Sequence, residues 1–196
     1  MVELENKYQI GVRRFGLINW VGAYTLYKKE VLRFIIVSGQ TLIGPILTSI
    51  LFLIVISLAI GEERSDVLGV PYIEFLANGL IMMQVIQQSF SHSSSSLMMS
   101  KMMGTIVDIV NSPLSAAEVT ISLVLASITR GICIASISTF IFIFFLDLSI
   151  QNYFLWFLYL FLAGFFLGSA GIIAGLYADK FDQMATVTNF VIVPLS

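Results

Sequence analysis

Hydrophobic residues in this chain form long runs that are separated by short polar segments. Four intervals contain no Asp, Glu, Lys or Arg: Arg33 to Glu62, Glu74 to Lys101, Arg130 to Asp147, and Asp147 to Asp179. About 20 mostly apolar residues suffice for a helix to cross a bilayer. The runs therefore predict four complete membrane-spanning helices at residues 34–60, 72–91, 118–146 and 153–177, and the start of a fifth near residue 186.

The continuity of these runs predicts an all-α fold. Strands of a membrane barrel would alternate apolar and polar residues over about ten positions at a time, and that alternation is not seen here. Composition agrees, because 58% of residues are hydrophobic and 11% are charged, far from the usage of soluble proteins. We conclude that the chain is a polytopic helical membrane protein. No cleavable signal peptide is visible, since the first 33 residues carry six Lys or Arg and no short apolar core.

The distribution of basic residues predicts the orientation. Six of the ten Lys and Arg precede the first span, Lys101 follows the second span and Lys180 follows the fourth. The opposite loops, at residues 61–71 and 147–152, contain acids and a single Arg. Because basic loops stay in the cytoplasm, we expect a multi-pass membrane protein with a cytoplasmic N-terminus. The net charge of -2 gives no indication of a nucleic-acid partner.

The segment before the first span is predicted to be an amphipathic helix at the membrane surface. Leu17, Val21, Tyr24, Tyr27 and Val31 recur at helical spacing, with basic residues mostly on other faces. Such a helix suits the headgroup region and membrane lipids, although a soluble stub with no particular role stays an alternative. Residues 1–33 are thus expected to form a cytoplasmic N-terminal segment and residues 34–196 a transmembrane domain.

The loop between the second and third spans is predicted to contain a short helix. Its pattern Thr105-Ile-Val-Asp108 is typical of a helix N-terminus, and Pro113 ends the helix. A second capping box, Ser115 to Glu118, starts the third span. Four aliphatic residues on a two-turn helix find little of their own chain to bury against, which indicates a protein partner or the membrane surface.

Three further features lie inside the predicted spans. One face of the second span is polar, which indicates either hydrogen bonds between helices or a translocation path; its residues are Gln84, Gln87, Gln88 and Ser91. Arg130 is the one basic residue deep in a span, where a salt bridge, a bound headgroup or a carbonyl contact would offset its burial. A small-residue groove for helix packing is predicted on the fourth span; its residues are Gly164, Gly168, Gly171 and Gly175.

Motifs for catalysis and for metal or ATP binding are missing from these 196 residues. No Gly-x-x-x-x-Gly-Lys-Ser/Thr phosphate loop occurs, so we expect no ATP binding by that route. The sole histidine, His92, gives no zinc motif and pairs with no evident nucleophile. We therefore expect a protein that is not an enzyme, has no catalytic residue and binds no metal or cofactor.

Five segments together resemble the ABC transporter type-2 permease family, the membrane subunits of bacterial exporters. They are "KKEVLRF", "GQTLIGPILTSILFLIV", "YIEFLANGLIMM", "IVDIVNSPLSAAEV" and "GLYADKFDQMATVTNFVIVPLS". The resemblance covers nearly the whole chain and rests on the order of these segments, since none is sharp alone. Family members have six spans, and here the resemblance stops inside the fifth, which suggests a chain truncated at its C-terminus.

The resemblance implies a function and its partners. The loop helix would be the coupling helix that docks on a separate ABC ATPase subunit, with Asp108 standing where the family usually has Glu. That helix would comprise Thr105, Ile106, Val107, Asp108, Ile109, Val110, Asn111, Ser112 and Pro113. ATP and Mg would bind to the ATPase subunits, and a second permease copy, giving a homodimer, would complete the translocation path. An ion-coupled secondary transporter and a non-transporting membrane scaffold stay as alternatives.

Overall fold

The computed structural model describes residues 18–60, 67, 69–146, 150 and 152–196. Predictions that concern residues 1–17, including Leu17, and most of the two loops expected on the outer face lie outside these described residues. The described part is helical throughout, and its β-structure is limited to one isolated bridge between Val67 and Val70. The predicted all-α class is confirmed.

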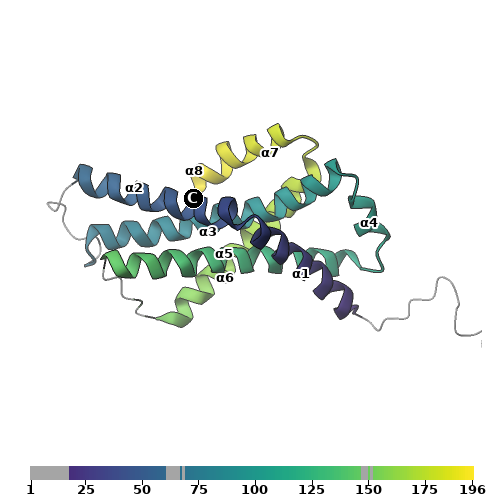
Figure 1. Cartoon of the computed structure of the whole chain (residues 1–196), viewed down its shortest axis with the longest axis horizontal. Helices are drawn as coiled ribbons and strands as arrows, with labels where there is room; N and C mark the ends of the chain where they lie inside the picture. The colour runs from purple at the N-terminus through teal and green to yellow at the C-terminus, as the bar shows by residue number, and fades with distance from the viewer. Residues whose placement is uncertain (1–17, 61–66, 68, 147–149, 151) are drawn as a thin grey trace, which may run out of the picture.

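The helices follow one another along the chain with short connections (Figure 1). In order they are α1 (Trp20–Ile36), the π-helical turn η2 (Gly39–Ile43), α2 (Gly44–Ile60), α3 (Tyr72–Met102), α4 (Ile106–Asn111), α5 (Ala116–Leu146), α6 (Tyr153–Tyr177), α7 (Phe181–Val187), the π-helical turn η3 (Thr188–Ile192) and α8 (Val193–Leu195). The region expected to start a fifth span is helical from Phe181 onward, a few residues earlier than predicted.

Three of the described helices are long and apolar enough to cross a membrane: Gly39–Ala59, α5 and α6. They correspond to the first, third and fourth predicted spans. The second predicted span lies in α3, which has 31 residues and so a length of about 46 Å. Its composition is more polar because it includes the serine run at residues 89–96, "SFSHSSSS".

The prediction that the second helix ends at Ser91 is wrong, because α3 continues through the serine run to Met102. Serines inside the helix donate to carbonyls of the preceding turn, as in Ser95 Oγ to His92 O at 3.2 Å and Ser100 Oγ to Ser96 O at 2.9 Å. Most of the run is buried inside the bundle. Neighbouring helices therefore cover the polar side of α3, which makes a polar helix tolerable at the centre of an apolar fold.

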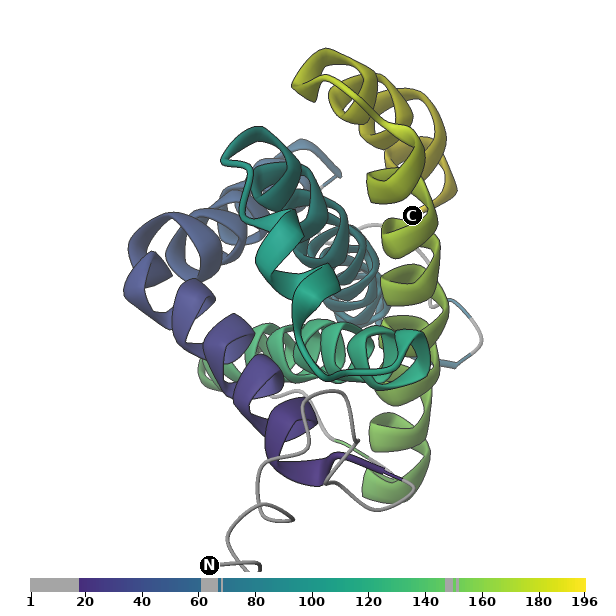
Figure 2. The same ribbon diagram turned by 90° about the vertical axis from the view of Figure 1, so that its right-hand side faces the viewer.

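Helix α3 is the centre of the bundle. Viewed from the end that carries α4, α3 and α5 lie between α1 and α2 on one side and α6 on the other (Figure 2). The apolar core near α2 includes Leu53, Val85, Ala135 and Phe142, all buried. Helices α2 and α5 end, and helix α3 begins, at the opposite end from α4, so the bundle has two distinct ends (Figure 1).

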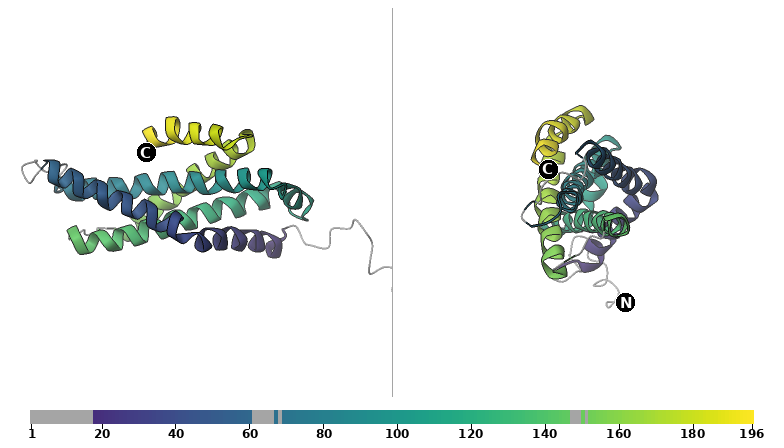
Figure 3. Two further views of the ribbon diagram at one scale, coloured as in Figure 1. Left: turned by 45° about the horizontal axis from the view of Figure 1, so that its top comes forward. Right: turned by 90° about the vertical axis from the view of Figure 1, so that its left-hand side faces the viewer.

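Helices α1 and α2 lie end to end with a change of direction between them (Figure 3). The interruption is η2, which comes just before Pro45, and a proline inside a helix removes a backbone donor and kinks it. Thr41 Oγ1 lies 2.9 Å from Phe34 O and 3.0 Å from Val37 O, so its hydroxyl can donate to either carbonyl at the interruption. The first predicted span is therefore a kinked segment whose straight part is α2.

The glycine stripe of α6 lies against two helices, and all four glycines are buried. A Cβ on Gly164 would meet Ile128 Cα of α5 at 3.1 Å, and one on Gly171 would meet Phe90 O of α3 at 2.5 Å. Small residues allow such close backbone approach. The stripe thus sets the distance of α6 from both α5 and α3.

Candidate functional site

Helix α4 lies across one end of the bundle, between the ends of α3 and α5 (Figures 1 and 2). Gly104 allows the chain to turn there, because its φ of 73° is in the left-handed region that follows many helices. The predicted capping box at Thr105 is wrong. Thr105 has helical backbone angles and its side chain makes no cap bond to α4; its Oγ1 donates instead to Ser100 O at 3.5 Å.

The aliphatic residues of α4 point in two directions. Ile106 and Ile109 are half-buried, whereas Val107 is 56% exposed and Val110 is 75% exposed. Asp108 lies in the first turn and is exposed. Helix α4 thus presents an apolar strip outward from the end of the molecule, next to an acidic side chain.

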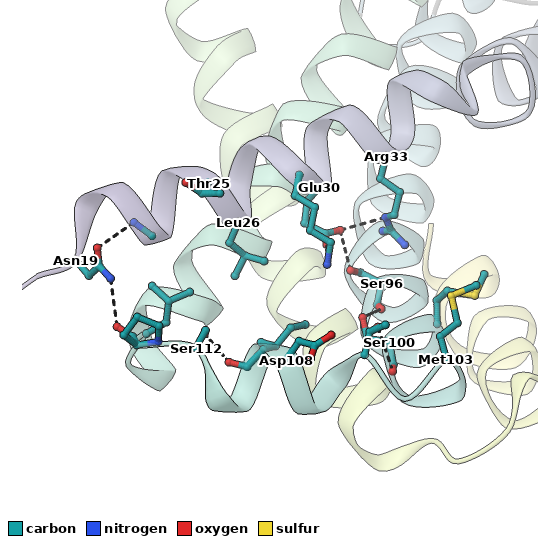
Figure 4. A pocket seen from close by; sticks show the side chains of 17 residues that line it. Asn19, Thr25, Leu26, Glu30, Arg33, Ser96, Ser100, Met103, Asp108 and Ser112 are labelled. Carbon is teal, nitrogen blue, oxygen red and sulfur yellow. Dashed lines mark hydrogen bonds and ion pairs between the residues drawn. The ribbon is translucent and has the colours of Figure 1, made fainter. Parts of the chain in front are cut away.

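Glu118 joins α4, α5 and the start of α1. One carboxylate oxygen accepts from the Asn19 backbone N–H at 2.6 Å and the other from the Ser115 backbone N–H at 2.6 Å. The Glu118 N–H donates in return to Ser115 Oγ at 3.3 Å, so the second predicted capping box is confirmed. Asn19 also donates from Nδ2 to Pro113 O at 3.2 Å (Figure 4). The end of α4 is therefore tied to α1 by a network that is buried at both Asn19 and Glu118.

A second junction holds the middle of α1 against the serine run of α3. Glu30 is 1% exposed and accepts from Ser96 Oγ at 2.7 Å, while Arg33 Nε lies 3.1 Å from the same carboxylate (Figure 4). Arg33 also donates to His92 O at 3.1 Å. The serine run therefore serves to seat the basic α1 on α3.

The two junctions flank a pocket of about 770 Å³ between α1, the end of α3 and α4. Figure 4 shows Leu26 and Glu30 on the α1 side, Ser100 and Met103 on the α3 side, and Asp108 on α4. Asp108 and Ile109 of α4 therefore form one wall of this pocket.

Helix α1 buries a different face from the one that carries the predicted apolar stripe. Leu26, Glu30 and Phe34 are buried, whereas Val21 and Tyr24 of the stripe are exposed. An exposed apolar stripe beside exposed Lys28 and Lys29 fits a helix in the headgroup region. Sequence reasoning did not anticipate the roles of Asn19 and Glu30. The signal was there for Glu30, the one acid in a helix whose other charged residues are basic.

Each of the predicted polar side chains on α3 makes a contact outside its own turn or lines a pocket. Gln84 Nε2 donates to Pro45 O at 3.2 Å and its Oε1 accepts from Ser138 Oγ at 3.0 Å, so it links α2, α3 and α5. Gln87 Nε2 donates to Ser196 Oγ at 3.0 Å. Gln84, Gln87 and Gln88 also line a pocket of about 360 Å³ against α2, and Ser91 lines a separate pocket. Helix contacts and a polar path are both compatible with this arrangement.

Arg130 lies near the middle of α5 and is 6% exposed. Its guanidinium donates to Gln88 Oε1 and, at 3.5 Å, to Thr41 O. Among the described residues no carboxylate lies within ion-pair distance of it. A salt bridge, a bound headgroup and a carbonyl contact were the alternatives expected for Arg130. The contacts seen among the described residues are to carbonyl oxygens.

Lys101, expected at the cytoplasmic end of the second span, has a structural role that the sequence did not reveal. Its Nζ donates to Leu176 O and, at 3.0 Å, to Ala178 O. Those carbonyls are at the C-terminus of α6, where a cation also favours the helix dipole. The end of α3 is thereby joined to the end of α6.

Comparison with known proteins gives one family. The family model described as "ABC-2 type transporter" matches residues 22–196. Among curated proteins, the chain is similar to "Inner membrane transport permease YadH" of Escherichia coli strain K12 and to the protein of the same name in Shigella flexneri. Each is 29% identical over 177 residues, which is 90% of this chain and 69% of the relative. No solved structure gives a significant match.

Proposed function

Because this chain belongs to the ABC-2 type transporter family and is a membrane permease, we propose that it works in an ATP-driven exporter. Separate ABC ATPase subunits would bind ATP and Mg and supply the energy, since the 196 residues contain no phosphate loop. Two permease copies would form the path through the inner membrane. The N-terminus, α4 and the basic residues around them would face the cytoplasm.

The observation that carries the coupling proposal is the exposed apolar strip of α4. Val107 and Val110 project from the end of the bundle that the charge distribution assigns to the cytoplasm. Spaced aliphatic anchors on a short helix are what a hydrophobic groove of a partner recognises. Asp108 beside them adds a charge that would orient the contact.

Movement of α4 would reach the rest of the bundle through its C-terminal anchor. Pro113 lies two residues after the end of α4, and its carbonyl accepts from Asn19, whose backbone N–H donates to Glu118. A displacement of α4 toward or away from the pocket under it would therefore pull on the starts of α1 and α5 together. Rigid helices would carry that displacement into the membrane.

The ion-coupled alternative receives less support from the described residues. Secondary transporters use carboxylates near the membrane middle to bind their coupling ion. The buried carboxylates described here, Glu30 and Glu118, lie toward the α4 end and are engaged in helix junctions. In the exporter proposal, the pocket beside α2 that is lined by glutamine amides is a better candidate for contact with cargo than these two carboxylates are.

The proposal is tested by co-expressing this chain with a tagged ABC ATPase subunit of the same genome and measuring co-purification from detergent. Val110→Asp is expected to reduce recovery of the complex at least tenfold, because it places a charge in the apolar contact. Ala117→Asp is the matched control, since it adds the same charge at an exposed position of α5 outside the coupling helix. Equal recovery of both variants, with normal membrane insertion, would refute coupling through this face of α4.

A further inference from the structure

A half-open pocket, the one that Ser91 lines, lies where α1 ends against α3 and α5. Its volume is about 480 Å³, within the range of small-molecule sites. Two arginines from different helices, Arg33 of α1 and Arg130 of α5, line it together with the amides of Gln40 and Gln88 and with His92. A pocket bordered by two guanidinium groups is positively charged unless carboxylates balance it.

The described residues balance only one of the two arginines. Glu30 lies 3.1 Å from Arg33 Nε and is shared with Lys29, whose Nζ is 3.9 Å away. Arg130 contacts two neutral oxygens, those of Gln88 and Thr41, and has no carboxylate within ion-pair distance in the part of the chain described here. Its Nε is buried without a hydrogen-bond partner there, as are both ring nitrogens of His92. The pocket therefore contains donors and positive charge in excess of its acceptors.

The position of the pocket along the bundle indicates where a ligand would come from. Helix α1 covers the first part of α5, with Ser122 Oγ donating to Ala23 O at 3.0 Å and the Tyr27 and Thr129 hydroxyls 2.9 Å apart. Beyond Arg130, α5 continues for about 24 Å to Leu146, which is about 6 Å less than the thickness of the hydrocarbon core. With Leu146 at the outer edge of that core, Arg130 would lie about 6 Å inside the inner edge, a depth from which a long arginine side chain reaches the lipid phosphates.

We infer that this pocket binds a phosphate group between Arg33 and Arg130. Guanidinium forks match phosphate oxygens in geometry and charge, and the amides of Gln40 and Gln88 can donate to further oxygens. Phe34, Val37 and Phe181 in the same wall give an apolar surface for the carbon skeleton attached to the phosphate. The phosphate belongs either to an anionic phospholipid headgroup or to a free phosphorylated molecule. The site is separate from the proposed α4 contact and does not depend on it.

The experiment is native mass spectrometry of the detergent-purified chain with added phosphatidylglycerol, phosphatidylcholine or inorganic pyrophosphate. Preferential retention of phosphatidylglycerol supports a lipid site, and binding of pyrophosphate alone supports a free phosphorylated ligand. Arg130→Gln and Arg33→Gln are each expected to weaken binding of the retained probe at least tenfold. Arg130→Lys, which keeps the charge, should retain more binding than Arg130→Gln.

Lys28→Gln is the matched control, because Lys28 is an exposed cation of the same α1 helix and does not line the pocket. Its binding is expected to stay within twofold of the unaltered chain. Thermal unfolding of each variant separates loss of binding from loss of folding, and Arg33→Gln, at a partly exposed position, keeps the test available if Arg130→Gln does not fold. If the folded arginine variants bind phosphatidylglycerol and pyrophosphate as well as Lys28→Gln does, the inference is wrong. It is also wrong if the unaltered chain retains neither of these two probes in preference to phosphatidylcholine.

Discussion

For the glycine stripe of α6, the structure predicts whether a substitution raises or lowers the stability of the fold. In Gly171→Ala the new Cβ would lie 2.5 Å from Phe90 O and 3.2 Å from Ser93 Cβ, both on α3. A carbon atom does not approach a carbonyl oxygen that closely, and a backbone atom cannot move aside as a side chain can. Helix α6 must therefore retreat from α3 along their contact.

The magnitude follows from two opposing terms. Overpacking costs about 1–3 kcal/mol, and an immovable backbone neighbour puts Gly171 at about 3. Alanine gains about 1 kcal/mol over glycine inside a helix, so Gly171→Ala should destabilise the fold by about 2 kcal/mol. Gly79→Ala on α3 is the matched control, since no atom lies within 4 Å of its Cβ. The control should stabilise the fold by about 1 kcal/mol, because alanine has a higher helix propensity than glycine.

The assay is thermal unfolding of each variant in one detergent, followed by circular dichroism. A difference of about 3 kcal/mol between the variants corresponds to about 6–12 °C for a chain of this size. Gly171→Ala should melt below the unaltered chain and Gly79→Ala above it. If both substitutions shift the melting temperature in the same direction by a similar amount, the close approach of α6 to α3 is refuted.

Three further substitutions test the polar junctions. Glu118→Ala removes the acceptor of two backbone N–H groups and should lower stability by about 3 kcal/mol; protease cleavage near α4 should also become faster. Glu30→Gln keeps an acceptor for Ser96 but removes the charge that faces Arg33. Because Arg33 is partly exposed, we expect a loss of stability of about 1–2 kcal/mol. Added salt should lower the stability of the unaltered chain more than that of the variant, so the difference between them should shrink. Gln84→Leu leaves the Ser138 hydroxyl and the Pro45 carbonyl without this partner and should cost about 1 kcal/mol.

Each of these three expectations has a definite contrary result. Unchanged cleavage and melting in Glu118→Ala would show that the α1 and α4 ends are not joined through its carboxylate. A Glu30→Gln variant with unaltered stability at low salt would remove the charge argument. For Gln84→Leu, the contradictory observation is a stable bundle together with lost transport, which would assign Gln84 to the cargo path.

The amino-acid sequence by itself determined the class of fold, most of the membrane helices, the loop helix and the glycine stripe. The physical reason is that lipid cannot hydrogen-bond to the backbone, so each span must be a helix long and apolar enough to be visible in the local pattern. The stripe of Gly164 to Gly175 is equally local, because spacings of three and four residues fix one face of a helix. The Ser115 to Glu118 box is also local and was predicted correctly.

Only the tertiary structure decided which distant residues meet. Glu30 and Ser96 are 66 positions apart, and Asn19 and Glu118 are 99 apart; their pairing depends on how the helices cross and rotate, which no local pattern specifies. The serine run seemed to end a helix, since serine competes for backbone hydrogen bonds, yet burial between helices keeps it helical to Met102. Thr105 had the sequence of a cap, but the turn at Gly104 gives it helical backbone angles, so its hydroxyl cannot cap α4.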